Sequence, residues 1–241
     1  EKSAKLAYQL DKVVSKDFFD ITTYTQKHKD TLDLTIGSCA MMGVGWTKII
    51  KPGKSFPIYQ QMKATNPDAM LWMGDNLYYL KHWKSAKKEI NANVKTRQIS
   101  ELANFLASCP QYSIWDDHDF GPDNSDGSFK GKFYSKTNFN NFWPNPQAID
   151  SSQGIYYAIQ YPQADIFMTD NRYNAKKGFT FWGETQMNWI QTELKNSTAP
   201  FKIIITGVQM GNKLSSYETL TSTGEYQKLV DFIKNEKIEG V

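Results

Sequence analysis

Short apolar runs and helix-like apolar repeats alternate along this chain. The run Ala69–Met73 is continuously apolar and is bounded by turn residues, which predicts a strand buried on both faces. Further strands are predicted over residues 31–36, 112–115, 154–160, 165–169 and 201–206. Helices are predicted over residues 55–64, 81–109, 137–142, 184–195 and 226–237, the last opened by a capping box from Ser222 to Glu225. Strands that alternate with helices predict an α/β fold.

The first 30 residues differ from the rest of the chain. Residues 1–20 mix lysine, aspartate and leucine in a weakly helical pattern that carries no chemical signal. We therefore expect a covering segment over residues 1–30 and the main domain over residues 31–241. A chain of 241 residues suits one large domain or two small ones, and it is long enough for a sizeable core.

Several predicted strands end in residues with unusual chemistry. Cys39, Asp75, Asp117 and Asp170 each lie at or just beyond the end of a strand. In open α/β sheets, binding sites form where the carboxyl ends of strands meet. We therefore expect these four residues to converge on one site.

The stretch Asp116-Asp117-His118-Asp119 is the densest group of ionisable residues in the chain. Carboxylates this close repel one another unless positive charge lies among them, which favours a bound cation. A solvated acidic loop is the alternative interpretation. Trp115 and Phe120 flank the group and argue against free solvation, because large aromatic residues are usually packed.

The supporting residues each have an alternative interpretation. Asp75 alone would be a turn aspartate, and Tyr78 alone would be a core residue. Cys39 is either a soft metal ligand or a small buried residue, and Cys39 and Cys109 could also pair, stay free or bind metal separately. Asp75 and Tyr78, together with the later Asp116-Asp117-His118, make a set of hard ligands that suits iron, manganese, calcium or zinc.

Composition narrows the classes of function. The net charge of +3 is small for this length and the lysines are spread along the chain, so no nucleic-acid groove is expected. No apolar run reaches the length of a membrane span, and no signal peptide is recognisable. The aromatic share of 14% suits a globular protein or a surface that faces carbohydrate or lipid. A module that stacks the aromatic rings near residues 139–143 on sugars is therefore one candidate.

Four motifs occur in an order that resembles the PhoD-like alkaline phosphatases of the calcineurin-like metallophosphoesterase superfamily. They are Gly37-Ser38-Cys39, Gly74-Asp75-Asn76-Leu77-Tyr78, Trp115 to Asp119, and Asp170-Asn171-Arg172. Each motif is weak alone, whereas four in this order are specific. Residues 184–190 are similar to the family's Gln-x-x-Trp-Leu helix. The resemblance implies a β-sandwich core flanked by helices.

The resemblance also implies roles for individual residues. Asp75 would be the carboxylate shared between two metal ions, and Cys39 and Tyr78 would bind one of these ions as iron. Asp117 would be a further metal ligand, and His118 takes the position of the superfamily's catalytic histidine. The implied cofactors are two or more metal ions, namely iron with calcium, manganese or zinc.

The implied reaction is hydrolysis of phosphate monoesters or diesters by a metal-activated hydroxide. Arg172 would offset charge on the phosphate oxygens, and its alternative role is a surface salt bridge. Asp116 and Asp119 either orient His118 or cap the turn. The rival interpretation is a catalytically inert metal-binding relative that acts as a binding protein.

The two ends of the chain raise further expectations. The PhoD-like family usually supplies a Gly-Asp-x-His motif on a strand after the last helix, whereas residues 237–241 end this chain without one. The remaining histidines, His28 and His82, fit no family motif. We therefore expect the C-terminal strands to be missing and a separate C-terminal segment to complete the site. A first residue other than Met is compatible with export to the periplasm, the medium or the outer surface.

Overall fold

The computed structural model describes residues 30–41, 56–79, 86–211 and 218–241, together with four two-residue strands nearer the N-terminus. The strands are β1 (Ala4–Lys5), β2 (Gln9–Leu10), β3 (Val13–Val14), β4 (Asp20–Ile21), β5 (Leu34–Gly37), β6 (Ala69–Met73), β7 (Gln111–Ile114), β8 (Tyr157–Gln160), β9 (Ala164–Met168) and β10 (Phe201–Ile205). The helices are α1 (Pro57–Ala64), α2 (Ala86–Arg97), α3 (Ser100–Leu106), α4 (Asp117–Phe120), α5 (Lys132–Phe142), α6 (Gly183–Asn196), the 3-10 turn η2 (Leu220–Ser222) and α7 (Glu225–Asn235).

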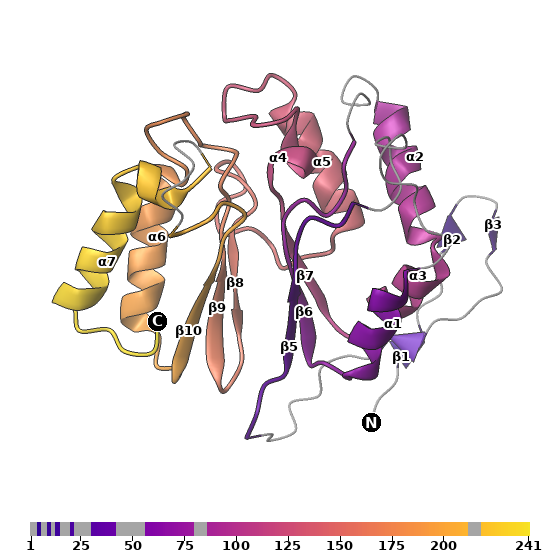
Figure 1. Cartoon of the computed structure of the whole chain (residues 1–241), viewed down its shortest axis with the longest axis horizontal. Helices are drawn as coiled ribbons and strands as arrows, with labels where there is room; N and C mark the ends of the chain where they lie inside the picture. The colour runs from indigo at the N-terminus through magenta and orange to yellow at the C-terminus, as the bar shows by residue number, and fades with distance from the viewer. Residues whose placement is uncertain are drawn as a thin grey trace.

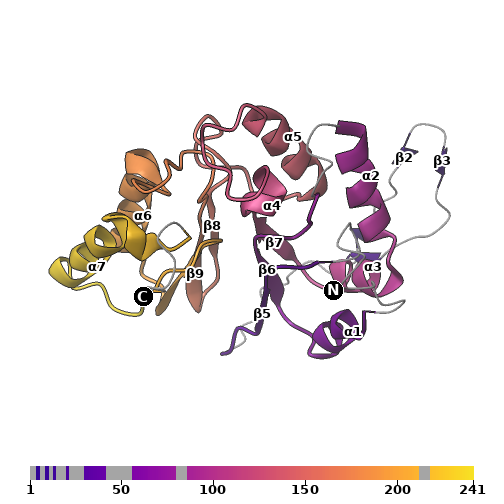
Figure 2. The same ribbon diagram turned by 45° about the horizontal axis from the view of Figure 1, so that its top comes forward.

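Two three-stranded sheets stand side by side at the centre of the molecule, and helices cover their outer faces (Figure 1). Helices α1, α2 and α3 flank the first sheet, whereas α6 and α7 flank the second. Helices α4 and α5 lie across one end of the sheets, as Figure 2 also shows. The arrangement is the helix-flanked sandwich that the sequence resemblance predicted.

The first sheet has the order β5-β6-β7, and both of its strand pairs are parallel. Strand β6 is central and has the bounds that its apolar run predicted. Because the three strands run the same way, their carboxyl ends meet at one edge. That edge carries the segments in which Cys39, Asp75 and Asp117 lie.

The second sheet has the order β10-β9-β8. Strands β9 and β10 are parallel, and β8 and β9 form an antiparallel hairpin. Every residue of β9 is buried, because it packs against the first sheet on one face and against α6 on the other.

Apolar side chains from both sheets form one shared core. Leu71 and Ile114 of the first sheet lie in the same buried cluster as Ile159, Ile166 and Met168 of the second. A separate cluster fills the space between the second sheet and its helices, with Ile190 and Leu194 of α6 among its members. Because sheet pairing, core and helices support one another, the sheet edge near α4 is held by rigid elements.

Some predicted elements differ in the structure. The weakly helical pattern over residues 1–20 was wrong where the chain is described, since β1 pairs with β4 and β2 pairs with β3. The long helix predicted over residues 81–109 is divided into α2 and α3 within its described part. Helix α5 begins at Lys132, five residues before the predicted start at residue 137.

The capping box predicted from Ser222 to Glu225 was also wrong. Gly224 is the N-cap of α7, so Glu225 is the first helical residue instead of the third. The Glu225 carboxylate accepts hydrogen bonds from the Thr180 hydroxyl and from the backbone N–H groups of residues 181–183, with N···O distances of 2.6 Å for Phe181 and 2.9 Å for Gly183. It therefore satisfies the first N–H group of α6, at Gly183, and those of the two residues that precede the helix.

Within the described ranges, no helix has the length and apolar character that a membrane crossing requires.

Candidate metal and phosphate site

The loops that follow β5 and β6 are bonded to each other at the carboxyl edge of the first sheet. Cys39 N donates to Gly74 O at 3.2 Å, and Ala40 N donates to Asp75 O at 2.9 Å. These bonds fix the backbone of Cys39 against that of Asp75. The Cys39 sulfur consequently lies 3.8 Å from the nearer Asp75 oxygen.

Both loops adopt a backbone conformation that L-residues rarely take. The φ angle is +55° at Cys39, +93° at Gly74 and +53° at Asp75. A Cβ atom at Gly74 would also lie only 2.6 Å from the Asp116 Cβ. Glycine is therefore required at this position both by the positive φ angle and by the lack of space for a side chain. Uncommon φ values of this kind tend to occur where a structure positions a functional side chain.

Three of the predicted site residues offer ligand atoms that lie close together. One ligand atom each from Asp75, Asp117 and His118 lies within 4.8 Å of the other two. The two aspartates are almost fully buried, at 7% and 5% exposed. The two carboxylates at this separation fit a divalent or trivalent cation, which would offset the repulsion between them, and the His118 imidazole lies beside them.

Asp75 lies at the centre of the predicted ligand set. The Tyr78 hydroxyl donates to Asp75 Oδ2 at 2.7 Å, and the His118 backbone N–H donates to Asp75 Oδ1 at 3.3 Å. Burial, with the nearby Asp116 and Asp117 charges, raises the pKa of Asp75 to about 6. Burial and the bond to Asp75 also raise the pKa of the Tyr78 phenol. Without a cation, therefore, the Tyr78 phenol keeps its proton, whereas Asp75 loses its proton only as the pH rises through about 6.

His118 lies at the solvent side of this group. Its ring packs against the Tyr78 ring with centroids 4.3 Å apart, and its side chain is 20% exposed. His118 Nε2 is 3.5 Å from a carboxylate oxygen of Asp123, which is largely exposed. The imidazole can therefore exchange protons with a molecule that enters from solvent.

Arg172 is buried and paired, so the alternative of a surface salt bridge was wrong. Arg172 Nε donates to Asp116 Oδ1 at 2.5 Å, and Arg172 Nη2 lies 3.8 Å from Asp117 Oδ1. Arg172 Nη1 donates to the Ser125 carbonyl at 3.3 Å. The neighbouring Asp116 and Asp117 charges raise the Arg172 pKa further, although burial opposes this. For Asp116, burial raises the pKa while Arg172 acts in the opposite direction.

Asp170 supports the site without joining the ligand group, which corrects the expectation that four strand ends supply it. Asp170 accepts hydrogen bonds from Trp115 Nε1 at 2.8 Å and from the backbone N–H groups of Ile155, Arg172 and Tyr173. Its two oxygens are therefore engaged in holding the loop that carries Arg172. The bond to Trp115 also joins the second sheet to the first.

Of the two uncertain aspartates, Asp119 caps the turn and Asp116 holds Arg172. The Asp119 carboxylate accepts from the backbone N–H groups of Asn76, Leu77 and Asp116 at 3.1 Å each. It thereby binds the loop after β6 to the start of α4. The described contacts of these two residues include none to the His118 ring.

The two sheets approach each other closely beside Asp116. A Cβ atom at Gly207, which follows β10, would lie 3.0 Å from Trp115 O and 3.1 Å from Asp116 Cγ. Asn171 Oδ1 accepts from Gly207 N at 3.1 Å and from the Thr206 hydroxyl at 3.0 Å, which fixes the ends of β9 and β10 together. The candidate site therefore lies on the junction between the sheets.

The structure also bears on the two cysteines and on the aromatic residues 139–143. Both cysteines are free, Cys39 exposed and Cys109 buried, so the disulfide alternative was wrong. The rings of Phe139 and Trp143 are buried in the core, which argues against the rival interpretation in which these rings stack on sugars. His28 and His82 lie outside the described residues.

The fold and this cluster define the class of the protein. Two helix-flanked sheets with carboxylates and a histidine at their adjoining ends are typical of metallophosphoesterase-like α/β proteins. A family model for PhoD-like phosphatases matches residues 34–234, so the chain belongs to the PhoD-like phosphatase family. The resemblance found in the four sequence motifs is thereby confirmed.

Solved structures support the same fold. The chain is similar to a structure of PhoD with a TM-score of 0.70 at 16% identity, over 93% of this chain and 53% of that one. It is also similar to a purple acid phosphatase from yellow lupin (Lupinus luteus) seeds, with a TM-score of 0.52 at 14% identity, over 78% of this chain and 32% of the other. The chain thus spans about half the length of the PhoD structure. A search of curated protein sequences gives no significant match.

Two contacts of the candidate site were not predicted from the sequence. Asp116 was not paired with Arg172, because 56 residues separate them and neither motif refers to the other. No role was assigned to Asn124, whose backbone N–H donates to Asp117 Oδ2 at 2.6 Å. The turn signal at Gly121-Pro122 places the chain near Asp117 and could have suggested this contact.

Proposed function

We propose that this chain carries the catalytic site of a metal-dependent phosphoric ester hydrolase, acting on monoesters or diesters. The observation that carries the proposal is the group Asp75, Asp117 and His118 with its ligand atoms within 4.8 Å, next to the buried Arg172. The family supports hydrolysis of phosphate esters as the general activity. In this proposal residues 31–241 are the catalytic domain and residues 1–30 are a covering segment.

The metal ligands in this proposal are Cys39, Asp75, Tyr78 and Asp117. Asp75 would be shared between two ions, since its carboxylate contacts Cys39 and Tyr78 on one side and lies near Asp117 on the other. Thiolate and phenolate donors suit iron, whereas the carboxylates also suit calcium, manganese or zinc. When bound, the metal ions would lower the pKa of a water ligand and offset charge on phosphate oxygens.

Arg172 would orient the phosphate group of the substrate. Its Nε is engaged by Asp116 and its Nη1 by Ser125 O, so the guanidinium plane is fixed before substrate enters. A fixed fork of N–H donors suits two phosphate oxygens at once. A cavity of about 20 Å³, enough for about one water molecule, lies beside Arg172; it is lined by Asn124, Asp126, Ala175, Lys177, Thr180 and Phe181.

His118 would transfer a proton to the leaving alkoxide. Its partial exposure and its contact with Tyr78 place an imidazole where the metal ligands meet solvent. Protonation of the leaving group by a positioned side chain typically contributes about 10²–10⁴-fold in rate.

Metal analysis combined with turnover of p-nitrophenyl phosphate and its bis-ester tests the proposal. Asp75→Asn should lower metal content and rate together, whereas His118→Ala should lower the rate much more than the metal content. Asp231→Asn on the outer helix α7 is the matched control and should change neither. Bound metal without turnover would instead indicate an inert relative. Neither metal nor turnover, both in the chain alone and in the chain co-expressed with a C-terminal segment that completes the site, would refute the assignment. The exported location implied by the resemblance belongs to the same proposal, and cell fractionation tests it.

A further inference from the structure

Two exposed phenylalanine rings lie close to a group of lysines beside the candidate site. Phe179 is 80% exposed and Phe133 is 66% exposed. Phe179 lies in a tight turn in which Lys176 pairs with Thr180, and Lys177 shares that turn. Phe133 lies in the first turn of α5. Neither ring is buried by a described part of the chain, so both present apolar surface to solvent.

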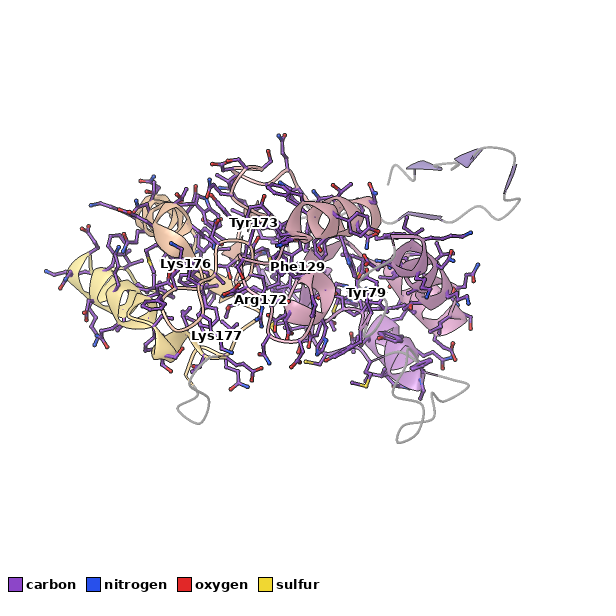
Figure 3. All side chains as sticks on the ribbon, turned by 90° about the horizontal axis from the view of Figure 1, so that it is seen from above. Tyr79, Phe129, Arg172, Tyr173, Lys176 and Lys177 are labelled. Atoms are coloured by element: carbon purple, nitrogen blue, oxygen red, sulfur yellow. The ribbon has the colours of Figure 1, made fainter. Side chains whose placement is uncertain are left out.

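The loop 126–129 joins the turn and α5 into one surface. On one side, Lys177 N donates to Asp126 Oδ2 at 3.3 Å and Gly127 N donates to Ala175 O at 2.9 Å. On the other side, Lys132 N donates to Phe129 O at 3.2 Å, where α5 begins. Figure 3, seen from above, shows the labelled Phe129, Arg172, Tyr173, Lys176 and Lys177 in the same central region of the molecule; Arg172 and Tyr173 are buried there.

Aromatic rings and lysines alternate across this surface. Lys132 Nζ lies 4.6 Å from the Tyr173 ring centre and 5.9 Å from that of Phe133, and Lys136 Nζ lies 5.2 Å from Tyr173. The Phe133 and Tyr173 rings are in edge contact, with centroids 6.2 Å apart. The Lys132 ammonium group is thus held beside the exposed ring of Phe133, and that of Lys136 is held over the neighbouring Tyr173 ring.

Three carboxylates lie beside this surface and offset part of its positive charge, since Glu225 accepts from Thr180 of the turn, Asp126 lies near Lys177 and Asp150 lies near Lys136. Asp126 accepts hydrogen bonds from the Ser128 hydroxyl and backbone N–H and from the Lys177 backbone N–H. Asp150 accepts from Ser152 and lies near Lys136, whose ammonium group donates to the Ser151 carbonyl. Against these three carboxylates, the surface carries four lysines.

We propose that this basic–aromatic surface docks the protein on an anionic lipid bilayer. The surface consists of Lys132, Phe133, Lys136, Lys176, Lys177 and Phe179. Exposed rings flanked by lysines fit a lipid interface, because the rings enter the acyl boundary while the ammonium groups bind anionic headgroups. A soluble anionic polymer would use the lysines and would leave the two phenylalanines without a role.

The basic–aromatic surface lies next to the candidate phosphate-binding residue Arg172, so docking on a bilayer would affect the position of that residue. Arg172 immediately precedes Tyr173, so one chain segment connects the candidate phosphate-binding residue to the basic–aromatic surface. Docking would therefore place Arg172 near the level of the lipid headgroups. The inference concerns membrane binding and does not depend on turnover.

Vesicle co-sedimentation of the chain tests this inference without an activity assay. The vesicles are phosphatidylcholine with about one third phosphatidylglycerol, compared with pure phosphatidylcholine. We expect binding to the anionic vesicles that weakens as salt rises. Lys176→Gln with Lys177→Gln should weaken it about 25-fold, since each lysine near an anionic leaflet contributes a factor of about five. Phe133→Ser with Phe179→Ser should weaken it about tenfold or more.

A matched control uses Ile58→Ser with Lys63→Gln on α1, where Ile58 is 54% exposed. This pair makes the same types of change away from the basic–aromatic surface and should bind like the parent chain. Phe133→Trp with Phe179→Trp should retain binding, which excludes unfolding as the cause of any loss. Absence of binding to anionic vesicles overturns the inference. A second result also overturns the inference: vesicle binding that is lost in the lysine variant but kept in the Phe→Ser variant, with equal binding to soluble polyphosphate. That result would assign the surface to an anionic polymer.

Discussion

The ion pair between Asp116 and Arg172 supports a quantitative prediction. Asp116→Asn and Arg172→Gln should each destabilise the protein, and the double variant should lose less than the sum. The reason is that either single change leaves a buried charge without its main partner. The Arg172 side chain is 6% exposed and that of Asp116 is 15% exposed.

The geometry sets the expected size of the effect. At the observed 2.5 Å and an effective dielectric constant of about 20, the gross attraction is about 7 kcal/mol. Desolvation of both groups offsets much of this attraction. Asp117, at 3.8 Å from Arg172 Nη2, retains part of the compensation when Asp116 is changed. We therefore expect a coupling free energy of about 2–3 kcal/mol.

Urea unfolding of the four proteins in the presence of a chelator measures this coupling without a contribution from metal. The exposed pair Lys195–Glu236, at 2.7 Å, is the control, and its Gln variants should couple by less than about 1 kcal/mol. Asp116→Asn should also lower kcat/KM for p-nitrophenyl phosphate about a hundredfold, because Arg172 loses its fixed orientation. A coupling below about 0.5 kcal/mol for Asp116 and Arg172 would refute the argument, since independent sites add within that range.

Three further outcomes are expected. Glu225→Gln should lower the free energy of unfolding, measured in urea, by about 2–3 kcal/mol, because the Glu225 carboxylate caps the start of α6. Glu184→Gln, in the first turn of the same helix, is the control and should lower it by less than about 1 kcal/mol. Gly74→Ala should lower the melting temperature far more than Gly211→Ala, where an added Cβ meets nothing within 4 Å; equal effects would show that the loop after β6 can relax. In metal-free protein, the pKa of Asp75 is about 6 when folded and 3.8 when unconstrained, so the folded state holds the extra proton and stability should fall as pH rises through this interval. A pH series of urea unfolding checks this, and Asp75→Asn should remove that part of the slope.

The sequence predicts the sheets well because their signals are local. The run Ala69–Met73 gives β6 with its observed bounds, since a central parallel strand is apolar throughout and turn residues border it. Helix α6 is found to within one residue at either end of its predicted range of 184–195. Each of these elements depends on residues that lie next to one another in the chain.

Contacts between distant segments are harder to predict. The sequence brings Asp75, Asp117 and His118 together because each follows a strand of one parallel sheet. It cannot distinguish Asp170, which has the same position after a strand, from these ligand candidates. Only the folded structure shows that Trp115 and three backbone N–H groups engage its oxygens. Glu225 was misassigned for the same reason, because its partners lie more than 40 residues away.

The junction between the sheets has a consequence for how the protein matures. Arg172 follows β9 of the second sheet, while Asp116 follows β7 of the first, and Trp115 reaches Asp170 across the same boundary. A chain in which each sheet has formed but the two have not yet docked therefore lacks an oriented Arg172. If the chain hydrolyses phosphate esters as proposed, this activity should appear in the last stage of folding, after the sandwich closes. A newly made chain would then pass through synthesis without attacking phosphate esters on the way.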